Sequence, residues 1–407
     1  MNDARNINSF SFKRTRNHLF LIATATAIGL AAISGPSEAG KAAPTPNVAA
    51  AFSATWSLPF ATAQFATVDP SGNVIAVGND ADNIVVSKYD TNGTPIGAWT
   101  FPDSRFVVGV ATDLSGNIVI ASRGTLSSLT PTGLSNFSYT PALPILGMAV
   151  DPSGNVVIAE GDWYTDLVIE KLSSTGVFSF TRSFTSTGGI EDFKLATDSA
   201  GNIVIAAAYQ DGTMSLGGVP LTTPYMDAMI VAKLSPLGSH VFSKIFNPTV
   251  APNGSSAGIY EVQLAVKSNN EIVVTGTVDG TGKFVVGNKS IALPPGGGQT
   301  TFLSKFNATG TTAFAKTIGN YGVHSAAVAI DNKDNIVITG EDGYGNFVGV
   351  AGGVFVASYA GTNGAMIHSA LVSDTGWGNS IAVNATTNDV VVAAGASGTQ
   401  YVTQLQD

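Results

Sequence analysis

The 407-residue chain contains no cysteine. This absence excludes disulfide bonds, thiolate metal ligands and a cysteine nucleophile, so the core alone has to stabilise the fold. Charged residues are also scarce: they make up 12% of the chain, which is about half the usual share in globular domains. Glycine, serine, threonine and asparagine supply the polarity instead, and this composition suits an all-β protein outside the cytoplasm.

Basic residues are too few and too dispersed to form a surface that binds nucleic acid. The formal net charge is −9, and it becomes −11 once residues 1–39 are set aside, because that segment carries four basic and two acidic residues. Binding to DNA, RNA or anionic lipid requires clustered Lys and Arg. We therefore expect none of these partners, and we expect a monomer whose dispersed charge serves solubility.

Long hydrophobic runs are missing except near the start of the chain. Leu19–Ile33 is apolar, follows the basic stretch Lys13–Arg16 and precedes a small-x-small cleavage site at Ser37–Ala39. A membrane anchor is the alternative interpretation, but a spanning helix needs about 20 residues and this run is shorter. The pattern predicts a cleaved signal peptide over residues 1–39, a flexible segment over 40–51, and export to the periplasm, the cell surface or beyond.

One short motif occurs seven times along the chain. A turn followed by a β-branched run begins at Asp69, Asp113, Asp151, Asp198, Lys267, Asp331 and Asn384. The copy at Asp151 reads DPSGNVVIAE, and Asp, Pro and Gly in this order are typical of a hairpin turn whose carboxylate accepts backbone amide hydrogens. A calcium loop is the alternative, but Ca²⁺ needs several oxygen ligands and most copies offer one carboxylate. We interpret the motif as a turn and expect no metal or other cofactor.

A second repeated element lies between the copies of the first. It reads SKYDTNG, EKLSSTG, AKLSPLG and SKFNATG, and its lysines are Lys88, Lys171, Lys233 and Lys305. We interpret these lysines as edge residues whose stems pack while the ammonium groups stay in water. Together with the runs before and after it, this element gives each repeat four short β-runs bounded by turn residues.

Four antiparallel strands repeated at about 40–50 residues are typical of a β-propeller blade. Seven repeats predict an all-β, seven-bladed β-propeller over residues 52–407. Ala51–Phe60 has the pattern of an isolated fourth strand, and Thr399–Asp407 has that of a third strand with nothing after it. Pairing of the two would complete the seventh blade and close the ring without an exposed edge.

The repeat unit resembles that of bacterial secreted proteins built from SBBP-type β-propeller repeats, whose units look like IAVDSSGNVYVTG, then DxFVAKLxxxG, then Trp. The resemblance covers about residues 52–407 and is strongest over Asp198–Phe246 and Tyr260–Ile318. It implies a propeller in an extracellular or surface setting, and it implies no activity, because the family shares no catalytic residues. Leu126–Gly133 departs from the pattern because it lacks the lysine.

The two repeated turns are expected on one face of the ring, where short regular turns leave little room for a site. The variable links, which join second to third strands and one blade to the next, are expected on the opposite face. They carry acids and aromatic rings, which stack on sugar rings and hydrogen bond to them, so this variable face is the predicted site for a polysaccharide or protein ligand. The candidate binding residues are Asp162, Trp163, Tyr164, Asp166, Glu191, Tyr209, Tyr260, Glu261, Tyr321, Glu341, Asp342, Tyr344 and Trp377.

Motifs of known enzymes, such as GxSxG, HExxH and the P-loop, do not occur in a supporting context. Of the four histidines, His324 alone is expected near the mouth of the central channel. A lyase or hydrolase that uses His324 with carboxylates such as Glu191, Glu261 and Asp342 is therefore the alternative to a binding or structural module. The two alternatives differ in whether His324 and at least two acids converge.

Overall fold

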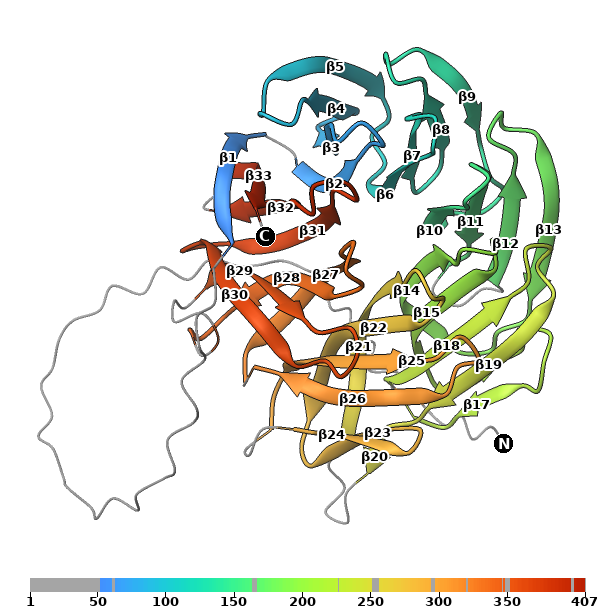
Figure 1. Ribbon diagram of the computed structural model, residues 1–407. Coiled ribbons are helices and arrows are strands. Elements are labelled where there is room, and N and C mark those ends of the chain that lie inside the picture. Colours follow the sequence, from blue (N-terminus) through green and yellow to red (C-terminus); the bar gives the residue numbers. More distant parts are fainter. Residues whose placement is uncertain are drawn as a thin grey trace, which may run out of the picture. The chain divides into compact units, whose positions relative to one another are not determined.

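The described part of the chain forms seven antiparallel sheets arranged as the blades of a β-propeller (Figure 1), as the repeats predict. Six of these sheets have four strands, and the sheet of blade 5 has a short fifth strand. The computed structural model describes residues 52–60, 63–162, 167–225, 227–250, 256–293, 297–319, 321–345, 347, 352–396 and 399–406. The predicted signal peptide over 1–39 and the segment 40–51 lie outside these residues. Within the described ranges, no helix has the length and apolar character needed to cross a membrane.

Within the described residues, blades 1 to 3 follow the chain without inserted strands. Blade 1 consists of β2 (Ala63–Val68), β3 (Val74–Asp80), β4 (Asn83–Tyr89) and β5 (Pro95–Pro102). Blade 2 consists of β6 (Val107–Thr112), β7 (Ile118–Ser122), β8 (Leu126–Leu129) and β9 (Ser135–Tyr139). Blade 3 consists of β10 (Ile145–Val150), β11 (Val156–Glu160), β12 (Leu167–Leu172) and β13 (Phe178–Phe184). The segment that lacks the repeated lysine thus still forms a third strand, β8.

Blades 4 and 5 carry additional strands. Blade 4 consists of β14 (Gly189–Thr197), β15 (Ile203–Gln210), β18 (Ala228–Leu234) and β19 (His240–Phe246), with a hairpin of β16 (Gly212–Met214) and β17 (Leu221–Thr223). Blade 5 consists of β20 (Thr249–Val250), β21 (Ser256–Val266), β22 (Ile272–Gly280), β25 (Thr300–Phe306) and β26 (Thr312–Ile318), with a hairpin of β23 (Lys283–Val286) and β24 (Lys289–Ala292). Met214 and Phe284 of these hairpins are buried in the blade cores, so both insertions have a structural role.

The last two blades close the ring. Blade 6 consists of β27 (Val323–Ile330), β28 (Ile336–Asp342), β29 (Gly353–Tyr359) and β30 (Met366–Ser373). Blade 7 consists of β31 (Trp377–Val383), β32 (Val390–Ala396), β33 (Thr399–Gln406) and, from the other end of the chain, β1 (Ser53–Pro59). β1 pairs antiparallel with β33, with Ser53 opposite Gln406. This pairing confirms the predicted closure of the ring.

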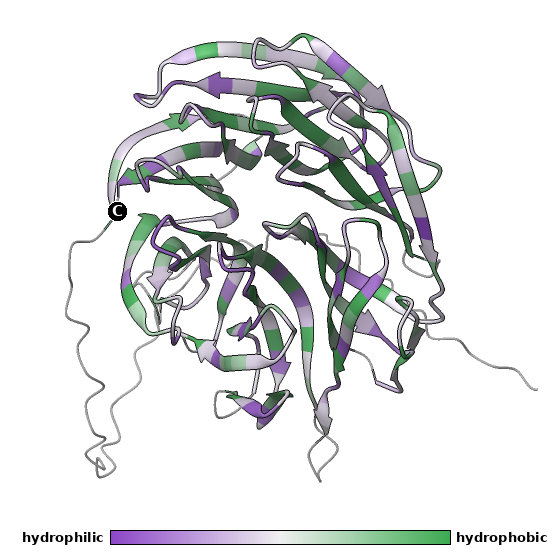
Figure 2. Cartoon of the chain, turned by 45° about the vertical axis from the view of Figure 1, so that its right-hand side comes forward, coloured by the Kyte–Doolittle hydropathy of each residue, from purple (hydrophilic) through white to green (hydrophobic). Residues whose placement is uncertain are grey.

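The core is concentrated in the second and third strands of the blades, where Figure 2 shows the hydrophobic residues gathered. Every residue of β7, β11 and β18 is buried. These strands have a hydrogen-bonded neighbour on each side and a neighbouring blade against each face, which explains their continuous apolar runs. The outer strands alternate instead, as in β5, because one of their faces meets water.

The repeated Asp motif forms the turn between the first and second strands, as predicted. In blade 3 the N–H of Gly154 donates to the carbonyl of Asp151 at 2.8 Å. One carboxylate oxygen of Asp151 accepts the amide hydrogens of Ser153 at 2.8 Å and Asn155 at 2.9 Å. The acid therefore holds its own turn together, in the manner of an Asx turn.

The repeated lysines are buried, which corrects the prediction that their ammonium groups stay in water. No more than 8% of their side chains is exposed in blades 1, 3 and 4. Each binds the turn carboxylate of its own blade, in the pairs Lys88–Asp69 (2.8 Å), Lys171–Asp151 (2.7 Å) and Lys233–Asp198 (3.0 Å). The third strand is an interior strand whose end lies beside the first turn, so the two sequence motifs meet as one ion pair.

Blade 5 reaches the same arrangement with the charges exchanged. Lys267 takes the place of the turn Asp, and Glu271 lies 2.8 Å from Lys267 and 2.9 Å from Lys305. Burial alone would raise the pKa of the Glu271 carboxyl, but the hydrogen bonds from Lys267, Lys305 and Asn269 lower it to about 2. Lys267 replaces the turn Asp of most other blades, and Glu271 of the same blade supplies the missing carboxylate.

Aromatic side chains of the outer strands lock each blade to the next. Phe137 of β9 rests on Gly176, in the turn between β12 and β13, where an added Cβ would lie 2.6 Å from the ring. Blade 7 has no such turn, because the two ends of the chain lie there. At that interface the ring of Phe52 packs edge-on against His368 of β30, with centroids 4.3 Å apart. Phe52 thereby supplies the contact that a turn supplies elsewhere.

Candidate functional site

The candidate binding residues fall into three groups in the structure. Trp163, Tyr164 and Asp166 lie outside the described residues. Tyr209 and Asp342 are fully buried. The others are partly or well exposed; they are Asp162, Glu191, Tyr260, Glu261, Tyr321, Glu341, Tyr344 and Trp377.

The buried pair corrects part of the predicted site. The hydroxyl of Tyr209 accepts a hydrogen bond from the N–H of Gly188 at 3.0 Å and lies 3.1 Å from the hydroxyl of Ser186. A carboxylate oxygen of Asp342 accepts the N–H of Phe347 at 2.7 Å. Tyr209 is the last residue but one of β15 and Asp342 is the last residue of β28; both side chains hold links in place and are not exposed at the surface.

Tyr321 and Tyr344 form an exposed, stacked pair over blades 5 and 6. Their ring centroids are 4.8 Å apart at an interplanar angle of 32°, and their hydroxyl oxygens are 3.5 Å apart. Tyr321 comes from the link between β26 and β27, and Tyr344 from the link between β28 and β29. Their exposed fractions are 43% and 58%. Two separate links therefore build one aromatic surface.

Backbone contacts fix this pair in place. The Tyr321 ring rests on Gly298 and the Tyr344 ring on Gly322, and an added Cβ at either glycine would overlap the ring. The N–H of Gly322 donates to the carbonyl of Gln299 at 2.8 Å, and the N–H of Gly343 donates to the carbonyl of Gly322 at 2.9 Å. The links that carry the two tyrosines are thus bonded to each other and to a link of blade 5.

Carboxylates continue from the tyrosine pair across blade 5 to blade 4. The pKa of the Tyr321 phenol is raised, first by its hydrogen bond with Tyr344 and to a smaller extent by Asp279. The pKa of the Tyr260 phenol is raised mainly by burial and then by carboxylates of both blades, namely Asp227, Asp279 and Glu191. Asp279 acts on both phenols, so it connects the tyrosine pair with Tyr260 and the carboxylates around it. We call this set, Glu191, Asp227, Tyr260, Asp279, Tyr321 and Tyr344, the acidic–aromatic stripe.

Hydrogen bonds hold the acids of the stripe in position. The side-chain amide of Gln210 donates to Glu191, and that of Gln299 donates to Asp279 at 3.4 Å. Asp227 and Asp279 were not among the binding residues predicted from the sequence. The available signal was their position at the variable face, because Asp227 directly precedes β18 and Asp279 is the last residue but one of β22.

The remaining candidates lie apart along the ring. Asp162 follows β11 in blade 3, and Trp377 begins β31 in blade 7, where its indole packs on Gly395. Glu261 of β21 accepts a hydrogen bond from the hydroxyl of Thr277 at 3.3 Å. The predicted set is therefore spread over five blades, and the structure gathers only part of it into the stripe.

His324 lies on β27, opposite Glu341 in the antiparallel pair. In the part of the chain that the structure describes, its imidazole makes no hydrogen bond or ion pair with a carboxylate. The same residues contain no group of three His, Asp or Glu side chains that could hold a metal ion. The convergence that a His324-based lyase or hydrolase requires is thus missing from the described residues.

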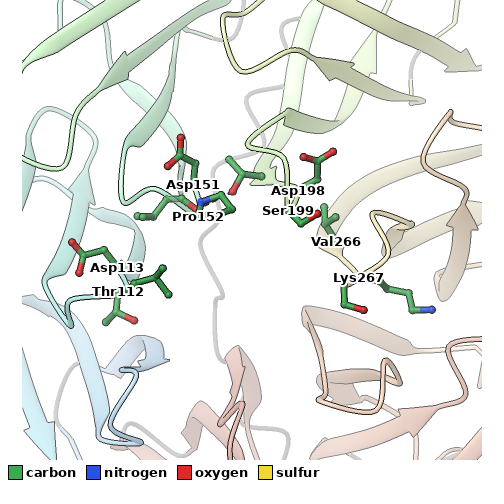
Figure 3. Close-up of a pocket in the computed structure, with 12 residues that line it drawn as sticks. Thr112, Asp113, Asp151, Pro152, Asp198, Ser199, Val266 and Lys267 are labelled. Atoms are coloured by element: carbon green, nitrogen blue, oxygen red, sulfur yellow. Dashed lines mark hydrogen bonds between the residues drawn. The ribbon is translucent and has the colours of Figure 1, made fainter.

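A cavity of about 410 Å³ lies at the turn end of the channel, on the face where we expected little room. Its walls are the first turns of blades 2 to 5, and they include Asp113, Asp151, Asp198 and Lys267. Figure 3 shows the charged ends of these side chains pointing away from the opening, toward their own blades. Thr112, at the end of β6, and Ser199, in the first turn of blade 4, are among the residues left to line the cavity.

Comparison with protein-family models gives no match, and comparison with curated proteins gives none either. Solved structures do match. The WD40 domain of Pan2 from Neurospora crassa has a TM-score of 0.57 at 10% identity, over 88% of this chain and 97% of that one. A catalytically inactive virginiamycin B lyase from Staphylococcus aureus with quinupristin has a TM-score of 0.55 at 11% identity, over 86% and 98%. BamB from Moraxella catarrhalis has a TM-score of 0.50 at 14% identity, over 88% and 100%. At such identities the similarity shows the propeller fold alone.

Proposed function

We propose that the protein is a secreted or cell-surface binding module that holds a polysaccharide on its variable face, at the acidic–aromatic stripe. The observation that carries this proposal is the Tyr321–Tyr344 pair. Tyrosine rings gain free energy from burial, yet these two are kept at the surface by rigid backbone contacts. An aromatic surface held open in this way is typical of a binding site.

The chemistry of the stripe suits sugars. The flat apolar face of a sugar ring stacks on an aromatic ring, and its hydroxyl groups donate hydrogen bonds to carboxylates. Tyr321 and Tyr344 offer the stacking surface, and Asp279, whose charge acts on the Tyr321 phenol, offers an acceptor within the stripe. Because the stripe continues over blade 5 to Glu191 of blade 4, it suits a chain of several sugar units better than a single one.

The setting supports the same proposal. The predicted signal peptide and the resemblance to SBBP-repeat proteins both favour a location at or beyond the cell surface. A protein ligand is the second candidate, because exposed tyrosines are also enriched where proteins bind one another.

An array of immobilised polysaccharides tests the proposal. We expect the protein to be retained by one class of glycan, and the double variant Tyr321→Ala/Tyr344→Ala to lose that retention. Phe178→Ala is the matched control, because it removes an aromatic ring of similar exposure (51%) from outer strand β13. Retention of the double variant, or no binding to any glycan, would contradict the polysaccharide proposal and leave the protein ligand.

A further inference from the structure

Two glutamates meet at the interface between blades 2 and 3. Glu160 is the last residue of β11, and its partner across the sheet is Val168 of β12. Glu170 lies two residues further along β12, so the side chains of both glutamates are on the same face of the blade. Only 1% of Glu160 is exposed. Blade 3 thus presses two acidic side chains against its neighbour.

The contacts of the two carboxyl groups come from blade 2 and from the link that follows it. A carboxylate oxygen of Glu170 accepts the hydroxyl hydrogen of Tyr139, from β9, at 2.5 Å. The Oε2 atom of Glu160 accepts the N–H of Leu143 at 3.2 Å. Among the described residues, no donor reaches its Oε1 atom. A proton between the two carboxyl groups would satisfy that atom, because Glu170 is the diagonal neighbour of Glu160 on the same face of the sheet, a spacing that long side chains can bridge.

The titratable groups that face Glu160 are Glu170, from its own blade, and Tyr139, from blade 2. Within the described ranges, no lysine, arginine or histidine forms an ion pair with either glutamate. Two carboxylates without a cation repel each other strongly in a buried place. One of them therefore keeps its proton to a higher pH than an exposed glutamate does.

The other six blades show that this pair is not a consequence of the fold. At the position of Glu160 they carry only small residues, which are Gly78, Ser122, Ala207, Gly276, Gly340 and Ala394. At the position of Glu170 they also carry only small residues, which are Ser87, Ser127, Ala232, Ser304, Ala357 and Thr403. Blade 3 alone has a large acid at both positions, so the two acids occur as a set.

We propose that Glu160 and Glu170 form an acid-stabilised clasp between blades 2 and 3, which is closed by a shared proton and loosens when that proton is lost. The protonated carboxyl donates to the other, and the other also accepts the Tyr139 hydroxyl. Glu160 directly precedes Gly161, whose N–H donates to the carbonyl of Pro144 at 3.0 Å in the link between the blades. Loosening of the clasp therefore reaches the variable face.

The sign of the pH dependence follows from the folded and unfolded states. Burial, and after it the hydrogen bond with Glu170, raises the pKa of the Glu160 carboxyl to about 7, whereas in an unfolded chain it is about 4.3. The stability from the clasp is complete below about pH 4.3, and it decreases as the pH rises through 7. In between, the folding equilibrium constant decreases by up to about tenfold per pH unit.

Urea unfolding between pH 5 and pH 8 tests the clasp with Glu160→Gln. The glutamine amide donates to Glu170 as the protonated acid does, but it does not titrate. We expect the variant to lose the decrease in unfolding midpoint that the wild type shows over this range. The matched control Asp80→Asn, which removes an exposed carboxylate at the end of β3, should keep it.

Two results would overturn the proposal. One is a Glu160→Gln protein whose urea midpoint depends on pH as that of the wild type does, and the other is a wild-type midpoint that does not decrease between pH 5 and pH 8. If the variant does not fold, hydrogen exchange of the wild type gives the answer. After correction for the intrinsic rate, amides of β10 and β11 should exchange faster at pH 8 than at pH 5, relative to those of β28 in blade 6. Equal changes in the two regions would contradict a local clasp.

Discussion

The ammonium nitrogen of Lys233 lies 3.0 Å from a carboxylate oxygen of Asp198, and at most 4% of either side chain is exposed. Asp198 begins the first turn of blade 4, and Lys233 lies near the end of its third strand. The two polar residues that mark the repeat most clearly are therefore a buried ion pair within one blade. On this face of the propeller, the repeated polar residues stabilise the individual blades.

Lys233→Met should destabilise the protein strongly, because it leaves the Asp198 carboxylate buried without its cation. Removing one partner of a buried pair costs about 3–5 kcal/mol. Lys244→Met, on outer strand β19, is the matched control and should cost less than about 1 kcal/mol. Urea unfolding measures both. The additional change Asp198→Asn should recover part of the loss, and a double variant as unstable as the sum of the single ones would contradict the pairing.

The same pairs predict a loss of stability in acid. Burial alone would raise the pKa of the Asp198 carboxyl, but the hydrogen bonds from Asn202 and Lys233 outweigh burial and lower it. The pKa values of the Asp69 and Asp151 carboxyls are lowered in the same way, by hydrogen bonds from a lysine and an asparagine. A lowered folded-state pKa gives stability that is present above about pH 4, the unfolded value, and is lost as the pH falls further.

The melting temperature, measured by thermal unfolding across pH 2–8, should therefore be highest near pH 4–5. Below this range the protein loses the stability that the Asp–Lys pairs provide, which gives an acid limb of the curve. Above it the protein loses the stability of the Glu160–Glu170 clasp. Lys171→Met should weaken the acid limb, because Asp151 then loses a hydrogen bond that favours its charged form. An acid limb of unchanged steepness in that variant would show that other carboxyls produce it.

Asn270 should stabilise the interface between blades 4 and 5 through its side chain. Its oxygen accepts the N–H of Ser199 at 3.0 Å and the hydroxyl hydrogen of Ser199 at 2.8 Å, although its own φ is 66°. Asn270→Gly loses these bonds but tolerates the backbone, whereas Asn270→Ala also keeps the strain. We expect the alanine variant to be about 0.5–1 kcal/mol less stable than the glycine variant, and both to be less stable than the wild type. Thermal unfolding of a glycine variant as stable as the wild type would contradict the role of the side chain.

Phe52, the residue directly before β1, should contribute strongly to ring closure. It is 6% exposed and lies in the core shared by blades 6 and 7. Phe52→Ala should destabilise the protein by about 3 kcal/mol, while Phe106→Ala, at a ring that is 69% exposed, should cost less than about 1 kcal/mol. Urea unfolding of both variants measures the difference, and equal effects would show that closure does not depend on this ring.

The prediction from the sequence was right about the propeller and its closure, because counting seven repeats needs no knowledge of side-chain contacts. It was wrong about the lysines because each motif was interpreted by itself, whereas the Lys88–Asp69 contact joins two motifs through the packing of the blade. It was also wrong about Tyr209 and Asp342, since residues at the ends of buried strands have the same types as those in exposed links. Tyr321 and Tyr344 were both predicted as binding residues. The contact between their rings was not predictable from the sequence, because it depends on how two separate links lie against each other.

We infer that the ligand binds on the variable face and that the turn face has a structural role. Calorimetric titration with the polysaccharide that the array selects tests this most directly. Tyr321→Ala/Tyr344→Ala should weaken the affinity by about tenfold or more, since each stacked aromatic ring contributes about 0.5–1.5 kcal/mol. Leu114→Ala, at a residue that is 77% exposed and lines the cavity of the turn face, should leave the affinity within twofold of the wild type. Loss of affinity in Leu114→Ala together with wild-type affinity in the tyrosine double variant would contradict the assignment and move the site to the turn face.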